Sequence, residues 1–489
     1  MKLWKGIVIG VLATAVALAA TSALAGTGIG GVFNLGKKNS ANATSSLSGK
    51  TSGALLKVTN TGSGTALQAT VKTGVAPLKV NSTTQVANLN ASLLGGFAAS
   101  YFLPATGTAA DSSKLGGLPA ATFYRLRTGP GDNIISTPDT SAGFGDDYTS
   151  TTIGTDGLPL ISVYSASALY VFHCTDLACS SPANIAPLDA SGDVGKYTSV
   201  TIGSDGLGLV SYYDVTNGDL KVAHCINVVC SSSTNTTLDS TGDVGQYTSI
   251  TIGADGFALI SYYDAGHGYL KAAHCMNVTC TSSTTSTVDN AADVGKYSSI
   301  TLSTDGVGLI SYYDATNGDL KVAHCNDVPC SISNKATVDN GGATDTGRYT
   351  SITIGADGMG LISYYSVAGT HLGVAHCSNT YCSSATTAGV NDCCAFGADS
   401  SITIGADGLG LISYYNGTNS ALSVVHCGNV ACSSSTSTLI DYPGDVGHYT
   451  SVTIGADGLP LISYLDTTNA ELKVAHCGNA FCTPYLRRR

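Results

Sequence analysis

The stretch "GSDGLGLVSYYDVTNGDLKVAHCINVVC" at residues 203–230 decides the fold, because close copies of it recur through the 489-residue chain. Its first aspartate, Asp205, has equivalents at Asp156, Asp255, Asp305, Asp357, Asp407 and Asp457. In chain order the seven aspartates are separated by 49, 50, 50, 52, 50 and 50 residues. A fixed period near 50 residues is typical of β-propellers and solenoids, so the repeat takes priority over any local motif.

One copy divides into four short strands with no helical pattern. Residues 198–203 alternate apolar and polar side chains, and residues 207–214 and 219–225 are rich in β-branched and aromatic types. Asn217-Gly218, between the last two, is a strong hairpin signal. Residues 230–239 are polar and rich in Thr, as an exposed outer strand should be. Four strands in each copy describe a propeller blade.

The two ends of the repeat array complement each other. The seventh copy stops without a fourth strand, whereas residues 133–138, just before the first copy, resemble that strand. We therefore predict an all-β fold, a seven-bladed propeller of four-stranded blades spanning residues 129–489, in which residues 133–138 complete the last blade. An open solenoid is the alternative, but it would not need these complementary ends. The blades are predicted to start near residues 148, 197, 247, 297, 349, 399 and 449.

The N-terminus reads as a secretory signal over residues 1–25. Lys2 and Lys5 precede an apolar run at residues 6–20, and Ala23-Leu24-Ala25 forms a small-x-small cleavage site. An uncleaved anchor is the alternative. No later segment is long and apolar enough to span a membrane. We predict a secreted, extracellular or cell-surface protein with no membrane span after signal removal, in an oxidising environment.

Residues 26–128 differ from the repeats, with no Cys and long polar stretches. The segment "LKVNSTTQVANLNASLLGGFAASYFL" (residues 78–103) resembles modules found at the N-terminus of exported bacterial proteins and in phage tail fibres. The resemblance implies a β-rich stalk through which the protein could form oligomers. A partly disordered linker is the alternative, given the low-complexity composition. The net charge of −11 argues against a nucleic-acid partner, because phosphate binding needs clustered Lys and Arg.

Every copy carries two cysteines separated by four residues. Haem attachment needs Cys-x-x-Cys-His, which no copy has, and one copy supplies too few ligands for a zinc site. A disulfide closing the hairpin between the third and fourth strands fits the spacing and the oxidising compartment. The predicted pairs are Cys174–Cys179, Cys225–Cys230, Cys275–Cys280, Cys325–Cys330, Cys377–Cys382, Cys427–Cys432 and Cys477–Cys482.

The histidine before each first cysteine is also repeated seven times, at His173, His224, His274, His324, His376, His426 and His476. Sevenfold repetition favours a buried hydrogen-bonding role with a Ser, Thr or Asp partner in each blade over a single catalytic base. No catalytic residue is predicted from this set.

The face that carries the Asn-Gly hairpins and the connections between copies collects aromatic rings, carboxylates and amides. In the second copy these are Tyr212, Tyr213, Asp214, Asn217 and Asp219. Departures from the repeat on the same face are His267, Tyr269, His371, Cys393, Cys394, Asp399 and His448. Rings and carboxylates suit sugar recognition, and the same oxygens would suit calcium, although the spacing is not that of known calcium loops. We predict no cofactor and no metal site. Alternatively, these residues only shape the hairpins.

The unit "SITIGADGLGLISYYDATNGDLKVAHC", assembled from several copies, resembles a repeat of uncharacterised exported bacterial proteins, which implies a propeller without an established activity. "TIGADGLGLISY" is weakly similar to the Asp-box of sialidase-type propellers, but its Trp is missing from every copy. Glu471 is the only Glu, and Arg348 is the only Arg in the copies before the terminal Arg487–Arg489 run, so sialidase chemistry is disfavoured. We predict a non-catalytic binding or adhesion propeller whose ligand is an extracellular glycan or surface protein, with carbohydrate as the leading class. The alternatives are an extracellular hydrolase or lyase with its site on the Tyr/Asp-rich face, and a structural spacer.

Overall fold

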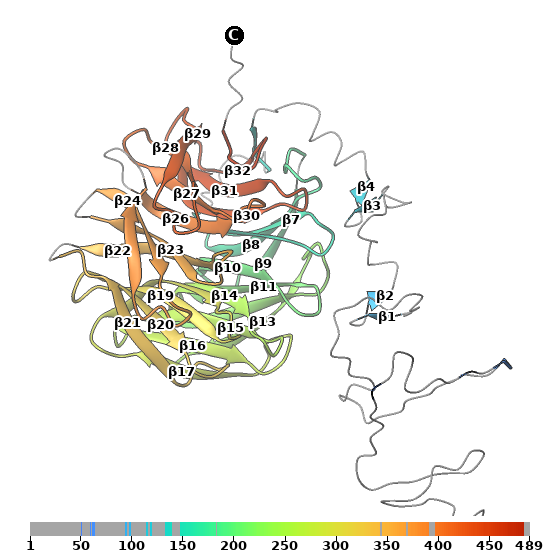
Figure 1. Cartoon of the computed structure of the whole chain (residues 1–489), viewed down its shortest axis with the longest axis horizontal. Helices are drawn as coiled ribbons and strands as arrows, with labels where there is room; N and C mark the ends of the chain where they lie inside the picture. The colour runs from blue at the N-terminus through green and yellow to red at the C-terminus, as the bar shows by residue number, and fades with distance from the viewer. Residues whose placement is uncertain are drawn as a thin grey trace, which may run out of the picture. The chain divides into compact units, whose positions relative to one another are not determined.

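The computed structural model describes residues 50, 59, 61–63, 93–94, 97–98, 114–115, 118–119, 133–138, 147–181, 183–342, 345–367, 370–390 and 397–483. The chain falls into two compact units, Met1–Phe102 and Leu103–Arg489. The second unit contains seven four-stranded antiparallel sheets, and the described residues include no helix. The predicted seven-bladed propeller of four-stranded blades is therefore confirmed (Figure 1).

Each of the first six blades is a run of four consecutive strands, here numbered as blades 1 to 6. Blade 1 contains β6 (Asp147–Ile153), β7 (Pro159–Ser165), β8 (Ala168–His173) and β9 (Asn184–Asp189). Blade 2 contains β10 (Val194–Ile202), β11 (Gly208–Asp214), β12 (Asp219–Cys225) and β13 (Ser233–Asp239). Blade 3 contains β14 (Val244–Ile252), β15 (Ala258–Asp264), β16 (Tyr269–Cys275) and β17 (Ser283–Asp289). Blade 4 contains β18 (Val294–Leu302), β19 (Gly308–Asp314), β20 (Asp319–Cys325) and β21 (Ser333–Asp339).

Blade 5 contains β22 (Thr346–Ile354), β23 (Gly360–Ser366), β24 (His371–Cys377) and β25 (Ala385–Gly389). Blade 6 contains β26 (Gly397–Ile404), β27 (Gly410–Asn416), β28 (Ala421–Cys427) and β29 (Ser435–Asp441). Blade 7 contains β30 (Val446–Ile454), β31 (Pro460–Asp466) and β32 (Glu471–His476). Its fourth strand is β5 (Ile134–Ser136), from the other end of the array.

The ring is closed by strand pairing between the two ends of the repeat array. In blade 7, Val474 pairs with Ser136 and His476 with Ile134. The Asn133 side chain adds two contacts, donating to the Cys482 carbonyl and accepting from the Gly478 amide, each over 3.0 Å. Because β5 precedes blade 1 in the chain, blades 1 and 7 cannot separate without breaking these bonds.

The apolar core lies between blades rather than within one. One cluster combines Leu209, Leu220 and Val222 of blade 2 with Ile260 and Tyr262 of blade 3. Equivalent clusters join the other neighbouring pairs, and one of them joins blades 7 and 1. Both faces of each blade are thus covered, which accounts for the nearly continuous burial of the second strands.

Two sets of polar contacts repeat around the ring. In the first, a hydroxyl near the start of each blade's first strand bonds to a serine in the second strand of the preceding blade. The pairs are Thr149–Ser463, Thr198–Ser162, Thr248–Ser211, Ser298–Ser261, Thr350–Ser311, Ser400–Ser363 and Thr450–Ser413. Because blade 7 bonds to blade 1 through Thr149, this belt is continuous.

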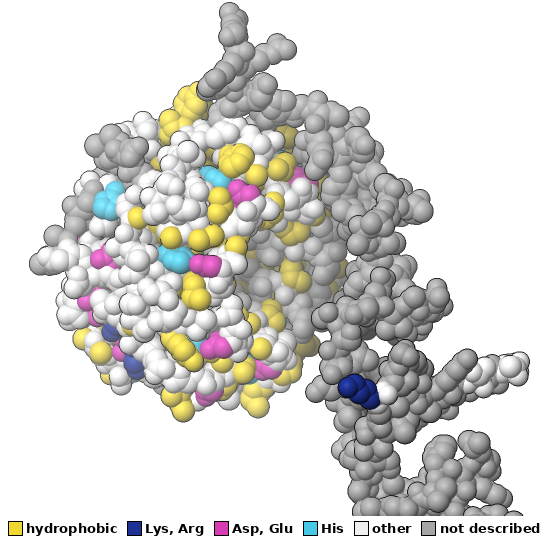
Figure 2. Space-filling model, viewed as in Figure 1, with side chains coloured by type: hydrophobic (Ala, Val, Ile, Leu, Met, Phe, Trp, Pro, Cys, Tyr) yellow, Lys and Arg dark blue, Asp and Glu magenta, His cyan; other side chains and the backbone are white. Residues whose placement is uncertain are grey.

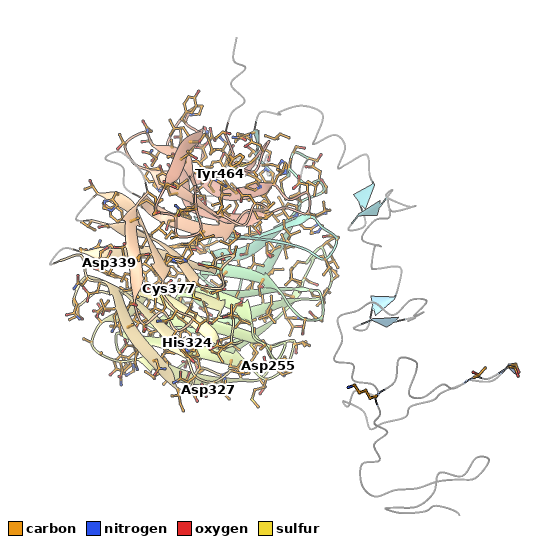
Figure 3. All side chains as sticks on the ribbon, in the orientation of Figure 1. Asp255, His324, Asp327, Asp339, Cys377 and Tyr464 are labelled. Carbon is orange, nitrogen blue, oxygen red and sulfur yellow. A yellow bond between two sulfur atoms is a disulfide. The ribbon has the colours of Figure 1, made fainter. Side chains whose placement is uncertain are left out.

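The second set links the last residue of one blade to the next blade. The Tyr262 hydroxyl donates to Asp239 Oδ2 over 2.7 Å, and Lys271 Nζ donates to the same oxygen over 2.5 Å. Equivalent Tyr–Asp–Lys groups are Tyr212–Asp189–Lys221, Tyr312–Asp289–Lys321 and Tyr464–Asp441–Lys473. Figure 3 labels Tyr464 and Asp339, both members of this set of inter-blade contacts.

All seven predicted disulfides are formed, with Cα atoms 4.7 to 5.0 Å apart. Each repeated histidine bonds through Nε2 to the aspartate of the first turn in its own blade, as His224 does to Asp205 over 2.8 Å. The other pairs are His173–Asp156, His274–Asp255, His324–Asp305, His376–Asp357, His426–Asp407 and His476–Asp457. These histidines therefore have the structural role that the repetition predicts. Seven disulfides fit an oxidising environment.

The N-terminal region contains two very short hairpins. β1 (Leu93–Leu94) pairs with β2 (Phe97–Ala98), and β3 (Lys114–Leu115) pairs with β4 (Leu118–Pro119). In the sequence, the two residues between the paired strands are Gly-Gly in both cases, at 95–96 and 116–117. No helix among the described residues has the length and apolar character to cross a bilayer. The predicted signal at residues 1–25 lies outside the described residues, as do Cys393, Cys394 and Arg487–Arg489.

Candidate functional site

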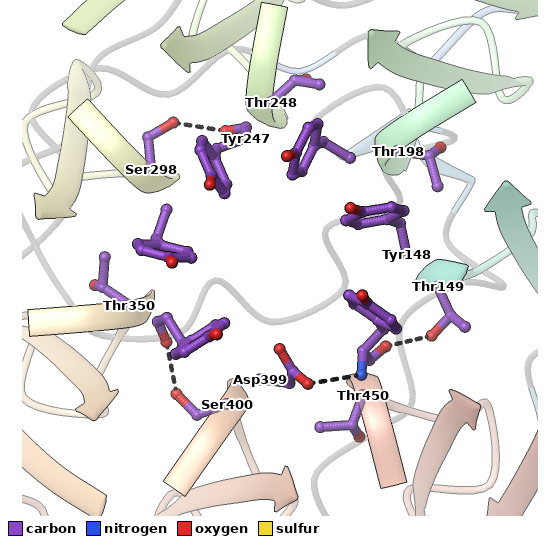
Figure 4. A pocket seen from close by; sticks show the side chains of 14 residues that line it. Tyr148, Thr149, Thr198, Tyr247, Thr248, Ser298, Thr350, Asp399, Ser400 and Thr450 are labelled. Carbon is purple, nitrogen blue, oxygen red and sulfur yellow. Dashed lines mark hydrogen bonds between the residues drawn. The ribbon is translucent and has the colours of Figure 1, made fainter. Parts of the chain in front are cut away.

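The axis of the propeller is lined by a ring of six tyrosines and one aspartate, one residue from each blade. The members are Tyr148, Tyr197, Tyr247, Tyr297, Tyr349, Asp399 and Tyr449. Neighbouring tyrosine rings lie 4.5 to 4.6 Å apart between centroids and are tilted by 44 to 55°. Figure 4 shows the rings around a central opening, with Asp399 occupying one place in the circle. We call this set the axial ring.

The local backbone explains how the axial ring forms. All seven members have positive φ values, from 49 to 56°, within a break in the pairing of the first strand with the second. In five blades a glycine with φ between 98 and 110° lies two residues earlier. At Gly245 an added Cβ would meet Leu220 Cα at 2.8 Å, so the approach of consecutive blades requires glycine there. The bulge turns the tyrosine of the innermost strand toward the axis.

The axial ring lines two neighbouring spaces, because all seven of its residues border both. The level on the side where the first strands begin has a volume of about 380 Å³ and is also lined by Ala398, Tyr415 and His448. A smaller space of about 180 Å³ continues along the axis, past the threonines and serines of the hydroxyl belt. The larger space opens on the face where the first strands begin. The hairpins between the second and third strands lie on this same face, because the end of each second strand pairs with the start of the first strand. We call this the entrance face.

Five of the six tyrosines of the axial ring have a raised pKa and are neutral. Burial, with the proximity of neighbouring hydroxyls and carboxylates, raises the pKa of Tyr148, Tyr197, Tyr247, Tyr349 and Tyr449 far above that of free tyrosine. The ring therefore offers uncharged aromatic faces and hydroxyls at any physiological pH. Any fixed charge in the axial pocket has to come from other side chains.

Asp399 breaks the sevenfold symmetry of the ring. Its Oδ2 accepts the Tyr449 backbone N–H over 3.2 Å and lies 3.5 Å from His448 Nδ1. His448 stacks on Tyr415, with 3.8 Å between ring centroids, and its Nε2 lies 3.2 Å from Asp445 Oδ1. Burial opposes a charge on His448, but the hydrogen bonds and charges of the two aspartates outweigh it and raise the pKa of the imidazole. An asymmetric, charged group thus forms on one side of the pocket.

The residue just before each member of the axial ring differs from blade to blade, although its neighbours are almost identical. The seven residues are Asp147, Lys196, Gln246, Lys296, Arg348, Ala398 and His448. Lys196, Lys296 and Arg348 are paired with Asp193, Asp293 and Asp345, three residues earlier. Burial raises the pKa of the Asp147 carboxyl against the attraction of Lys196 and His448. The rim of the pocket therefore differs in chemistry from blade to blade.

The predicted site residues of the second blade are mostly structural. Tyr212 and Asp214 are fully buried and Tyr213 is nearly so. Tyr212 bonds to Asp189, Tyr213 donates to Asp243 over 2.6 Å, and Asp214 accepts the Asn217 amides over 2.9 and 3.0 Å. These groups join blades or shape the hairpin, which was the alternative reading of the pattern.

The remaining predicted residues that the structure describes lie on the entrance face, and two of them reach the axis. Asp219 is half-buried at the start of β12, and its pKa is raised by burial and by Asp214. His267 is exposed and stacks on Tyr269 with 5.5 Å between centroids, while His371 is half-buried at the start of β24. Asp399 and His448 line the axial pocket.

Sequence reasoning did not assign the tyrosines of the axial ring to the axis. The signal was present: a Tyr follows Val-Gly-x in four copies, at residues 194–197, 244–247, 294–297 and 446–449, and the innermost strand of a blade lines the axis. The expected start of that strand fell at the tyrosine itself, whereas β10 begins three residues earlier, at Val194. Across the described ranges, no three His, Cys, Asp or Glu side chains come together in a way that could hold a metal ion.

No protein-family model matches the chain, and no curated protein is similar to it. Among solved structures, the hydrazine synthase of Kuenenia stuttgartiensis is similar at 9% identity and a TM-score of 0.48, over 68% of this chain and 95% of that one. An alpha-L-arabinanase of Penicillium chrysogenum, solved with arabinobiose, matches at 12% identity and a TM-score of 0.44, over 71% and 97%. A protein of unknown function from Dyadobacter fermentans matches at 10% and 0.43, over 70% and 97%. At these identities and TM-scores the likenesses carry no argument about what this chain binds or catalyses.

Proposed function

We propose that the protein is a non-catalytic binding propeller that recognises a carbohydrate in its axial pocket. The observation that carries this proposal is the axial cavity of about 380 Å³, bounded by tyrosine rings and one carboxylate. Ligand pockets of this kind combine aromatic walls with a few polar groups that fix orientation. Tyrosine faces can stack on a pyranose ring while the hydroxyls and Asp399 bond to sugar hydroxyls. One axial site predicts one ligand per propeller.

We further propose that the protein works outside the cytoplasm, secreted or displayed on the cell surface, with an extracellular glycan or glycan-bearing surface protein as partner. Seven disulfides and the signal-like residues 1–25 support this location. Residues 26–128 would then serve as a stalk that holds the propeller away from its attachment and provides the contacts for any oligomer. The surface itself fits a non-electrostatic partner, because Figure 2 shows a face on which uncharged side chains predominate.

Glycan-array binding with two matched variants tests the proposal. Tyr247→Asn removes one ring of the axial pocket while keeping a residue that tolerates positive φ. Tyr269→Asn removes a tyrosine of the same face that lies on a hairpin outside the pocket. We expect saturable glycan binding that Tyr247→Asn weakens and Tyr269→Asn leaves intact. Binding lost only with Tyr269→Asn would move the site to the hairpins, and no saturable binding at all would favour a structural spacer.

A second candidate is an extracellular hydrolase or lyase acting in the same pocket. Asp399 breaks the symmetry of the axial ring, with His448 beside it and Asp147 on the rim. The raised pKa of Asp147 suits an acid, while Asp399 would serve as base or nucleophile. The discriminating measurement is turnover of a panel of nitrophenyl glycosides. Release of nitrophenol by the wild-type protein, abolished in both Asp147→Asn and Asp399→Asn, would establish an enzyme. Binding without release supports the non-catalytic proposal.

A further inference from the structure

We infer that the axial pocket selects a ligand bearing a protonated amine, such as an amino sugar with a free amino group. This inference rests on the proposed function, because it assigns a chemical class to the ligand of the same pocket. It starts from the one place where the axial ring departs from tyrosine. Asp399 has the same backbone conformation as the six tyrosines, with φ of 53°, so its carboxylate replaces an aromatic ring at the axis.

The Asp399 carboxylate keeps one oxygen for a ligand. Its Oδ2 contacts the Tyr449 amide and His448, as described above. Among the described residues, Oδ1 has no hydrogen-bond partner, and Figure 4 shows the Asp399 side chain within the circle of tyrosines. The Asp399 side chain is about one-eighth exposed, at 12%. A carboxylate oxygen in such a site is a strong acceptor for a charged donor.

The charges around the pocket leave an excess of negative charge beside this oxygen. His448 has both ring nitrogens near carboxylates, at 3.5 Å from Asp399 and 3.2 Å from Asp445. A charged His448 therefore leaves this group of three side chains with one net negative charge. The residues that line the pocket include no Lys or Arg.

The basic residues of the rim are held away from the pocket. Lys196, Lys296 and Arg348 each pair with an aspartate and lie over outer tyrosine rings, at 5.2, 5.3 and 5.5 Å from the centroids of Tyr164, Tyr263 and Tyr313. None of these three outer tyrosines lines the axial pocket. The cationic side chains thus do not compete for Asp399.

The aromatic walls favour the same ligand charge. A cation over a tyrosine face is attracted by the ring quadrupole, most strongly where water is excluded. Because the tyrosines stay neutral, they add this attraction without a competing anionic charge of their own. A cavity of about 380 Å³ lies at the lower end of the range for small-molecule sites and suits a single sugar unit. A protonated amine on that unit would meet Asp399 while its ring lies against tyrosines.

Isothermal titration of the full-length protein at about pH 6, with four probes, tests the inference. The probes are glucosamine, which is protonated, glucose and N-acetylglucosamine, which are neutral, and tetramethylammonium, which is a cation without a sugar ring. We expect glucosamine to bind at least about tenfold more tightly than either neutral sugar, the difference expected for one charge-assisted hydrogen bond. Asp399→Asn should remove that preference, so that glucosamine and glucose bind this variant with affinities within about twofold of each other.

Asp319→Asn is the matched control, because it removes the same charge from the entrance face at a residue that neither lines the pocket nor pairs with Lys196, Lys296 or Arg348. It should leave the glucosamine preference unchanged, and far-UV circular dichroism should show both variants folded. Equal affinity for glucose and glucosamine would overturn the inference while the carbohydrate proposal stands. Binding of tetramethylammonium with no sugar binding would support a cation site and overturn the carbohydrate proposal. Failure of all four probes to bind would overturn the inference.

Discussion

Removal of the Asp239 carboxylate should loosen the contact between blades 2 and 3. Asp239 is buried, with 6% of the residue exposed, and its Oδ2 accepts from Lys271 Nζ over 2.5 Å and from the Tyr262 hydroxyl over 2.7 Å. The Lys271 side chain is only 12% exposed, so Asp239→Ala leaves an ammonium group without its counter-charge in a poorly hydrated place. Breaking one partner of a buried pair costs about 3–5 kcal/mol of unfolding free energy.

The protein itself contains a junction without this charge pair. In blade 6 the lysine position is Ser423, and the Tyr414 hydroxyl contacts Ser437 over 3.0 Å instead of an aspartate. The double change Asp239→Ala with Lys271→Ser should therefore cost less than the sum of the two single changes, by about 1–3 kcal/mol of coupling. As a matched control, Asp219→Ala removes a half-buried carboxylate of blade 2 whose pKa is raised, and it should change stability by less than about 0.5 kcal/mol.

Urea unfolding followed by far-UV circular dichroism, with the disulfides intact, measures these differences as shifts of the midpoint at constant slope. A loss below about 1 kcal/mol for Asp239→Ala would refute the role given to the Tyr–Asp–Lys groups. Strict additivity in the double variant would show that Asp239 and Lys271 stabilise the junction independently.

Three further predictions concern the frame that holds the pocket. Burial opposes the charge of Asp189, but hydrogen bonds from its lysine, serine and tyrosine partners outweigh this and lower its pKa to about 2, from 3.8. Because this pKa is lowered on folding, the Asp189 carboxylate contributes its full stabilisation above about pH 4, and about 2 kcal/mol of it should be lost as the pH falls from 4 to 2. The thermal midpoint, measured across this pH range for the wild-type protein and for Asp189→Asn, tests this prediction. Gly245→Ala should cost more than about 2 kcal/mol in urea, because φ is +106° and the new methyl would lie 2.8 Å from Leu220 Cα; an unchanged midpoint would contradict the bulge geometry. Replacing Cys275 and Cys280 by Ser should cost about 2 kcal/mol, measured in the same way, and a stable reduced wild-type protein would argue against the disulfides as staples.

Most of the fold could be predicted because it depends on regular features of the sequence. The seven copies of the 50-residue repeat give the number of blades, and Asn217-Gly218 and its equivalents mark the hairpins. The missing last strand of the seventh copy and the strand-like residues 133–138 indicate how the ring closes, and β5 pairs with β32. Repetition also indicated the disulfides and the structural histidines, because a group that occurs in every blade is better explained by a role in the fold than by one catalytic site.

The site was harder to predict because it depends on backbone geometry that the repeat pattern does not display. The axial tyrosines sit in a bulge with positive φ, a conformation unusual for tyrosine, so alternation alone does not assign them to the axis. Conversely, Tyr212 and Asp214 look like surface residues of a polar hairpin but are buried by the neighbouring blade. Asp399 could be singled out as a departure from the repeat, but its position in the pocket required the structure.

The most direct test is a crystal structure of the full-length protein soaked with glucosamine at about pH 6. The structure described here predicts one glucosamine molecule per propeller, inside the ring of tyrosines, with its ammonium group within hydrogen-bond distance of Asp399. Sugar molecules on several blade hairpins with the axis left to solvent would contradict a single axial site.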